Sequence, residues 1–124
     1  MDSRARKRRS KVSYSLCEEK KMTQPELFDV VELLVDLPKF NLSAGIQGAI
    51  VECYQDNNYE VEFSNSDGET LAFCALSARQ FVVVWSAKTK TWLPISERVA
   101  AILDNLNSKR QEEVLDFARF LYHK

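Results

Sequence analysis

A two-residue alternation of apolar and polar side chains in the middle of the chain limits the folds open to it. In the segment 59–63 the apolar side chains alternate with Glu60 and Glu62, and the segment 71–75 again has apolar residues at every second position. Alternation of this period puts one face of an extended strand in a core and the other in solvent. The turn-forming residues before each segment, 56–58 and 66–68, therefore predict an antiparallel meander.

Three further segments are predicted to complete the sheet. The run from Leu27 ends at Leu37-Pro38, since the residue before proline is pushed to extended geometry. The segments 49–51 and 81–85 are rich in β-branched or aromatic residues, and 77–80 is predicted to be the turn before the last strand. Five short strands within residues 22–85 predict a small SH3-like antiparallel β-barrel, and the whole chain falls in the α+β class.

Glycine marks the predicted turns. Gly45 and Gly48 precede a strand, and Gly68 lies between the two alternating segments. We interpret all three as structural turn residues, because glycine adopts positive φ and permits close backbone approach. The spacing is no phosphate-binding loop, because a strand follows it and the lysine of such loops is missing.

The C-terminal part is predicted to be helical. Residues 86–93 are interpreted as a linker, and residues 94–124 as a helical hairpin packed on or beside the barrel. Ser96 is the expected N-cap of the first helix and Asn107 its left-handed C-terminal residue. Ser108 and Gln111 fit a capping box that begins the second helix.

The second helix carries a wide apolar stripe, with two interpretations that stay open at this point. The stripe either caps the open end of the barrel or leaves a patch for a partner or a second copy of the chain. In the second case the partner-binding residues are Val114, Phe117, Phe120 and Leu121.

Charge is distributed unevenly along the chain. The segment 22–85 has ten acidic residues against Lys39 and Arg79, a net of −8, whereas residues 1–21 carry a net of +5. An acidic barrel repels phosphate, so nucleic acid is an expected partner only of the basic segment 1–21. That segment is either a disordered basic arm or a non-native extension ahead of Met22.

No reaction is predicted. His123 is the only histidine and is the penultimate residue, while Cys17, Cys53 and Cys74 have neither zinc-ligand nor redox-motif spacing. We expect no enzyme, catalytic residue, cofactor or metal. The apolar runs are too short to span a membrane, and a cytoplasmic location is expected.

Two stretches resemble known families. The motifs at 27–31, 44–48, 59–63 and 67–70 resemble an uncharacterised family of small bacterial proteins, a domain of unknown function frequent in cyanobacteria, over about residues 26–85. This resemblance implies a small β-barrel with no established activity. Residues 111–121 resemble the helix of a second uncharacterised bacterial family whose members are often antitoxin-like partners of toxins, although the Leu-Pro that usually precedes it is Leu106-Asn107 here.

These observations favour a non-enzymatic protein-binding module, with an antitoxin or immunity-like partner protein as an example. The acidic barrel would cover a basic surface and the C-terminal helix would fill an apolar groove. The alternative is a nucleic-acid-binding small barrel that uses the basic arm.

Overall fold

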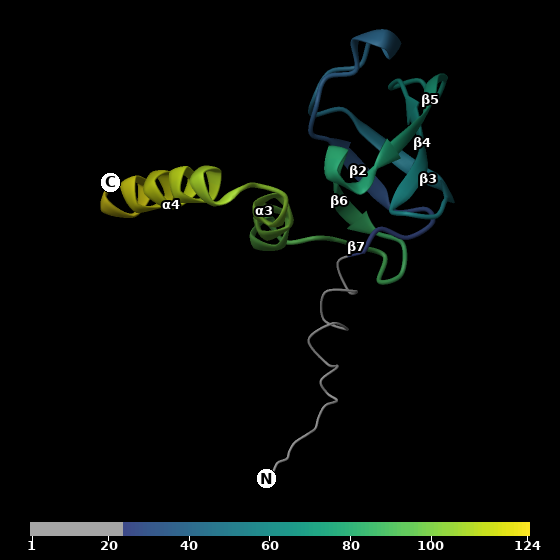
Figure 1. Cartoon of the computed structure of the whole chain (residues 1–124). Coiled ribbons are helices and arrows are strands. Elements are labelled where there is room, and N and C mark those ends of the chain that lie inside the picture. The colour runs from purple at the N-terminus through teal and green to yellow at the C-terminus, as the bar shows by residue number, and fades with distance from the viewer. Residues whose placement is uncertain (1–23) are drawn as a thin grey trace.

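The computed structural model describes residues 24–124, so the expectation for the segment 1–21 lies outside the described residues. Figure 1 shows a twisted sheet followed by two helices. The strands are β2 (Val30–Leu33), β3 (Gln47–Cys53), β4 (Asn58–Ser64), β5 (Thr70–Ser77), β6 (Phe81–Ser86) and β7 (Thr91–Trp92). The helices are α3 (Ile95–Asp104) and α4 (Ser108–His123), and the single 3-10 turns are η1 (Pro38–Phe40) and η2 (Ala78–Gln80).

The meander predicted from the alternation is confirmed. Strands β3, β4 and β5 pair antiparallel in chain order, and Val61 of β4 lies between Ile50 and Cys74 in the register. All three side chains are buried, whereas Glu60 and Glu62 are on the opposite face. The alternating apolar residues of β4 therefore fill the core, because alternate side chains point to opposite sides of a sheet. In β5 the predicted face is wrong: Leu71 and Phe73 are exposed, and Cys74 and Leu76 are the buried residues.

The hairpin turns use the residues expected of them. Asp56 and Asn57 have φ values of 62° and 60°, and Gly68 has a φ of 83°. Gly45 has a φ of 101° in the loop before β3, so Gly45 and Gly68 are turn residues as predicted. Gly48 differs, because it is within β3 and its hydrogen faces the Phe63 ring and the Glu62 carbonyl. Its role is close packing rather than turning.

Strand β2 is shorter than the apolar run that predicted it, because the chain turns before it. The Asp29 N–H donates to the Glu26 carbonyl at 3.1 Å, and Phe28 has a φ of 74°. Asp29 is only 3% exposed, and its carboxylate accepts from the backbone N–H groups of Glu26 at 2.9 Å and Ala87 at 2.8 Å. This carboxylate thus ties the start of β2 to the turn after β6.

The expected closed barrel is replaced by an open antiparallel sheet of six strands. The order is β5-β4-β3-β2-β6-β7, so β5 and β7 are its edges. The predicted last core strand, β6, pairs with β2 rather than with β5. The segment expected to be a linker contains β7, in which Trp92 lies opposite Trp85. Two residues are too few to show alternation, which is why sequence reasoning missed this strand.

Helix α3 covers the outer side of β6. Val82 and Val84 are buried but stand apart from the main core, on the side where α3 packs on this strand. The helix begins two residues earlier than expected: Pro94 is its N-cap, and Ser96 is inside the first turn. Proline fits there because the first turn of a helix leaves its N–H groups without intrahelical partners.

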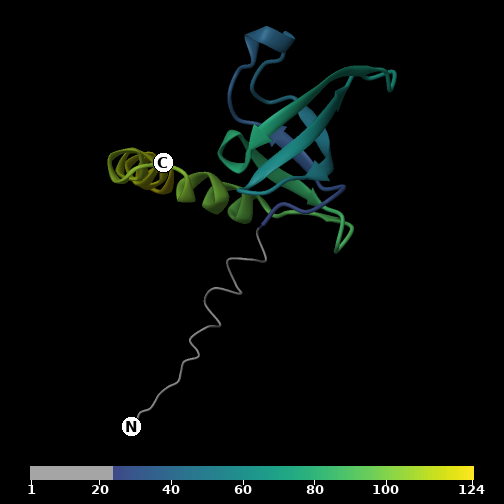
Figure 2. The same cartoon turned by 45° about the vertical axis from the view of Figure 1, so that its right-hand side comes forward.

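The two helices do not form the expected hairpin. Asn107 is the N-cap of α4, with an extended backbone, and its side chain accepts from the Arg110 N–H. Gln111 does not close a capping box on Ser108. Its Nε2 donates instead to the Leu103 carbonyl at 2.7 Å and links α4 to the end of α3. Figures 1 and 2 show α4 running across the direction of α3 and away from the sheet.

Candidate functional site

Helix α4 carries more exposed large hydrophobic side chains than any other element of the described residues. Phe117 is 61% exposed, Phe120 60% and Leu121 50%, while Val114 is half-buried. The structure therefore places the four predicted partner-binding residues on one helix with their side chains largely free. Leu115 and Tyr122, not named in the prediction, extend the same surface and are 48% and 91% exposed.

Local features explain why this segment is helical. The Asn107 side chain caps the first turn, and ion pairs one turn apart join Arg110 to Glu113 at 3.8 Å and Arg119 to Asp116 at 3.3 Å. Such pairs on an exposed helix contribute only about 0.2–0.5 kcal/mol each. Because they are weak, they leave the helix dependent on packing.

That packing is absent within the described residues. No residue of α4 is buried, and the helix projects from the sheet in both views (Figures 1 and 2). An isolated helix of about this length is marginal in water, since most helical stability in proteins comes from packing an apolar face. The exposed stripe of α4 is therefore an apolar helix face without packing in the described residues.

The two phenylalanines of the stripe form one continuous aromatic surface. The rings of Phe117 and Phe120 are stacked, with centroids 6.3 Å apart and planes inclined by 26°. Preformed aromatic surface of this kind suits an anchor in a protein interface, because little side-chain freedom is lost on binding.

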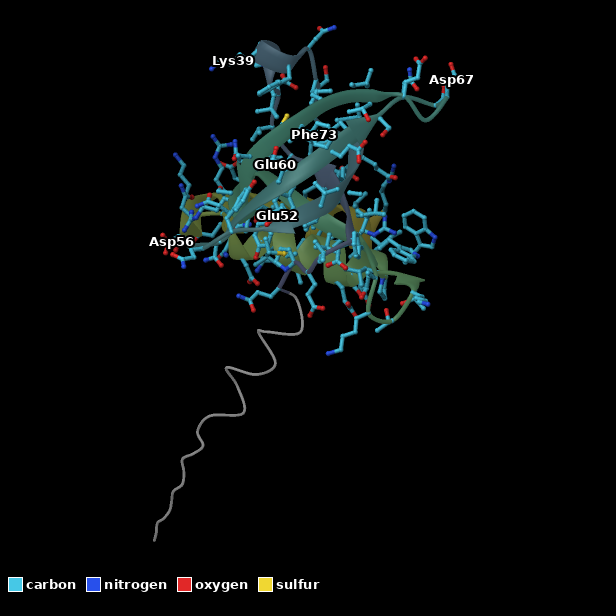
Figure 3. The ribbon with its side chains drawn as sticks, turned by 90° about the vertical axis from the view of Figure 1, so that its right-hand side faces the viewer. Lys39, Glu52, Asp56, Glu60, Asp67 and Phe73 are labelled. Atoms are coloured by element: carbon cyan, nitrogen blue, oxygen red, sulfur yellow. The ribbon has the colours of Figure 1, made fainter. Side chains whose placement is uncertain are left out.

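A second surface lies on the outward face of the sheet. Glu62 of β4 is opposite Phe73 of β5, and Glu60 is opposite Glu52 of β3. Figure 3 shows Glu52, Glu60 and Phe73 along this face, with Asp56 and Asp67 at the turns on either side. Phe73 is 55% exposed. We call this set, together with Glu62, the acidic face.

Neighbouring hydroxyl groups hold two of these carboxylates. The Tyr54 hydroxyl donates to Glu60 Oε1 at 3.1 Å and the Thr70 hydroxyl donates to Glu62 Oε2 at 2.6 Å. The hydrogen bond to Glu60 raises the pKa of Tyr54, since the phenol donates only while it is protonated. In the part of the chain that the structure describes, the ion pairs are those on α4, so the acidic face presents its charge to solvent.

The cysteines show no sign of activation. Cys53 is exposed at the end of β3, and partial burial together with the charge of Asp29 and Glu52 raises the pKa of its thiol. Cys74 is buried, and burial raises the pKa of this thiol as well. A raised pKa lowers the thiolate fraction, which is the nucleophilic form. Cys17 lies outside the described residues.

The described residues offer few groups for metal binding or other chemistry. Among residues 24–124, no three His, Cys, Asp or Glu side chains come together as a metal site. In the same residues, no helix combines the length and apolarity needed to cross a membrane. His123 lies beside Tyr122 in the last turn of α4, away from the acidic face.

Comparison with known proteins gives one family. No curated protein and no solved structure matches the chain. Residues 27–83, which run from the turn before β2 into β6, match the model of a domain of unknown function, DUF4926, whereas α3 and α4 lie outside the matched residues.

Proposed function

We propose that the chain is a non-enzymatic protein-binding module in which α4 supplies the main docking surface. The observation that carries this proposal is a 16-residue amphipathic helix without a buried residue. Such a helix gains most of its stability on binding, by laying its apolar face in a groove of another protein.

The aromatic residues supply the affinity. Full burial of one large apolar side chain contributes about 1.5–3 kcal/mol. About three-fifths of each of Phe117 and Phe120 is exposed, so burying both contributes roughly 2–4 kcal/mol. Leu121 and Val114 border them and would exclude water around the anchors.

The acidic face supplies specificity. Its carboxylates have no cationic partner in the described residues, and a partner with a basic surface would be attracted before contact. Electrostatic attraction of this kind acts mainly on the association rate and weakens with salt. The partner therefore combines an apolar groove with a basic surface.

We also propose that the sheet is related to SH3-like barrels. A three-stranded meander, a single 3-10 turn and a final strand that returns to pair with the first is a strand order that supports an SH3-like assignment. In this assignment the barrel stays open between its edge strands β5 and β7.

The biological class follows from the helix. The resemblance of residues 111–121 to a bacterial antitoxin-like family supports a cytoplasmic antitoxin- or immunity-like protein, whose partner would be a toxin or another effector. An acidic sheet beside an apolar helix suits that role, because it can cover a basic functional surface on the partner.

Capture of the partner tests the proposal. The full chain, tagged, is used to pull proteins from a native lysate at low salt, and the bound protein is identified and quantified by mass spectrometry. We expect a stoichiometric protein that is lost with Phe117→Asp and Phe120→Asp. Trp92→Asp is the matched control, because Trp92 is similarly exposed but lies on β7, at the opposite edge of the sheet from β5. Equal capture by all variants would reject α4 as the docking surface.

Nucleic acid is the alternative outcome of the same experiment. The basic segment 1–21 is the part of the chain suited to a phosphate backbone. An eluate with a high ratio of absorbance at 260 nm to that at 280 nm, abolished by deleting residues 1–21, would replace the protein-binding proposal with the nucleic-acid one.

A further inference from the structure

The outward face of the sheet carries exposed aromatic rings among its carboxylates. Phe73 of β5 is 55% exposed, and Tyr54, just after β3, is 49% exposed and donates to Glu60. Helix α3 packs on β6, two strands away from β3, and so leaves this part of the sheet open. The acidic face is therefore a mixed surface of negative charge and aromatic rings.

Two carboxylates of this face oppose one another directly. Glu52 of β3 and Glu60 of β4 are partners in the register, which places their Cβ atoms about 5 Å apart on one side of the sheet. Like charges at such positions destabilise a sheet. From residue 50 to residue 70 the chain has six acidic residues and no basic residue, so the neighbouring turns add to this repulsion. A cation above the face would relieve it.

The described part of the sheet does not supply that cation. Lys39 and Arg79 are the basic residues of the segment 24–85. Lys39 is on η1, apart from the acidic face in Figure 3, and Arg79 is on η2. Neither forms an ion pair with another described residue, since the ion pairs there are on α4.

A segment of the same chain outside the described residues has the complementary composition. Residues 4–11 have a cation at six of eight positions, four arginines and two lysines, and no acidic residue. A guanidinium group pairs with carboxylates and stacks on aromatic rings, and the acidic face offers both kinds of group. The complementarity is thus one of charge and of side-chain type.

The chain can bring this segment to the acidic face. The Phe28 N–H donates to the Ile50 carbonyl at 2.8 Å, so the chain enters the sheet beside β3, two residues from Glu52. Residues 12–23 can span up to about 40 Å, which exceeds the length of the sheet. Strand β4 has seven residues and is about 23 Å long, and residues 4–11 span about 26 Å when extended.

We infer that residues 4–11 lie along the acidic face of their own chain, with guanidinium groups above the carboxylates and beside the Phe73 ring. Each exposed ion pair is weak by itself. The connection through residues 12–23 keeps the local concentration of the segment in the millimolar range, so a set of weak contacts is sufficient.

This contact adds a competition step to the proposed function. The acidic face is the surface that the proposal assigns to a basic region of the partner, and this consequence rests on that proposal. Because one surface cannot hold both, the partner must displace residues 4–11 before it covers the face. A partner with too little positive charge is excluded by the chain itself.

Zero-length cross-linking of the full chain tests the contact. A carbodiimide joins a carboxylate to a lysine amine when the two groups touch, and mass spectrometry of the digested chain locates the bond. We expect Lys7 and Lys11 to be joined to carboxylates of the acidic face at low salt. The yield should fall at least about fivefold in about 0.5 M salt. Glu112 and Glu113 are the internal control, because they are exposed on α4.

An equal mixture of ¹⁵N-labelled and unlabelled chains distinguishes a contact within one chain from a contact between copies. If the segment binds its own sheet, both halves of every cross-linked pair carry the same isotope. Mixed pairs at half of the total would overturn the inference. Cross-links to Glu112 and Glu113 as frequent as those to the acidic face would overturn it as well.

A basic probe tests the competition. The probe is a fluorescent octa-arginine peptide, whose binding to the full chain is measured by anisotropy at low salt. The variant with Arg8→Glu and Arg9→Glu should bind it about tenfold more tightly than the wild type, because the segment no longer covers the face. Lys109→Glu with Arg110→Glu is the matched control, since it changes the net charge equally but on α4, and should tighten binding by no more than about twofold.

Removal of the acceptor charges completes the test. In a chain with Glu60→Gln and Glu62→Gln, the changes at Arg8 and Arg9 should alter probe binding no more than the control does. Equal tightening by the Arg8/Arg9 variant and the α4 control in the wild-type background would contradict the contact, because the effect would then be one of net charge alone.

The outcome for the proposed function is read separately. Cross-links confined to the acidic face, in a chain that captures no partner through α4, would keep this inference and reject the proposed function. Capture of a partner through α4, without cross-links from Lys7 or Lys11 to the acidic face, would do the reverse.

Discussion

Replacement of Gly48 by alanine should test how tightly the sheet is packed. A Cβ at this position would lie 2.8 Å from the Glu62 carbonyl oxygen and 2.8 Å and 2.9 Å from two ring carbons of Phe63. The ring is fully buried, and the carbonyl belongs to the β3–β4 ladder, so neither can move freely. Overpacking of this kind costs about 1–3 kcal/mol, and we expect the upper end.

Urea unfolding followed by tryptophan fluorescence measures this cost. With an m value of about 1.5 kcal/mol/M, a loss of about 3 kcal/mol lowers the unfolding midpoint by about 2 M. Gly68→Asn is the control, because Gly68 has open space around it and asparagine tolerates its positive φ.

A double variant identifies the cause of the loss. Combined with Phe63→Leu, which removes the ring, Gly48→Ala should cost at least about 1 kcal/mol less than it does alone. A Gly48→Ala midpoint close to that of the wild type would refute the close approach of β3 and β4.

Three further predictions concern single groups. Asp29→Asn should lower the free energy of unfolding by about 2 kcal/mol in the urea assay, because the amide leaves one of the buried N–H groups of Glu26 and Ala87 without its acceptor; a loss below about 0.5 kcal/mol would contradict this role. Cys53 should react slowly with a thiol reagent at pH 8, since its pKa is raised, and higher salt should speed the reaction by screening nearby carboxylates. Mass spectrometry of the labelled peptide measures this rate. A rate unaffected by salt would count against the electrostatic contribution to the pKa shift. Burial raises the pKa of Cys74 above its ordinary value of 9.0, so the stability that the buried thiol contributes is complete below pH 9.0 and is lost as pH rises through the folded-state pKa. Compared by urea unfolding at pH 8 and pH 10, Cys74→Val should lose less stability at the higher pH than the wild-type chain does. An equal loss would contradict the assignment.

The antiparallel meander could be predicted from the alternation, which also gives the buried face of β4. The buried face of β5 could not be predicted, because every residue from 71 to 76 is apolar and the core side holds Cys74 and Leu76 rather than Leu71 and Phe73. Glu60 and Glu62 alternate with core residues in the sequence and lie on the outward face in the structure. The closure of the sheet could not be predicted this way, since a strand's pattern states which face is buried but not which strand pairs with it. Strand β7 is fixed by its pairing with β6 and by the turn before it, not by its two residues alone.

Helix ends were predicted to within one or two residues, and the differences have local causes. Proline at position 94 can begin a helix, so the Ser96 hydroxyl was not needed as a cap. Asn107 was expected to end α3, but its side chain accepts from the Arg110 N–H and begins α4 instead. Asparagine is suited to either position, so the sequence alone leaves both open.

The candidate site was visible in the sequence as a stripe too wide for one neighbour. Periodicity gave Phe117 and Phe120 as candidate residues, but whether the stripe packed on the sheet depended on the direction in which α4 leaves α3. The Gln111 side chain, bonded to the Leu103 carbonyl, joins the two helices where that direction is set. The buried Asp29 was missed, although a carboxylate within an apolar run was a signal that could have identified it.

Hydrogen exchange of α4 amides in the full chain tests the central claim most directly. At the lowest usable concentration, and without a partner, we expect the α4 amides to exchange far faster than those of β3, because the helix has no packing of its own. Their protection should rise with added partner, while that of β3 stays constant. Protection of α4 equal to that of β3 at the lowest concentration would contradict the claim that this helix is an unpartnered docking surface.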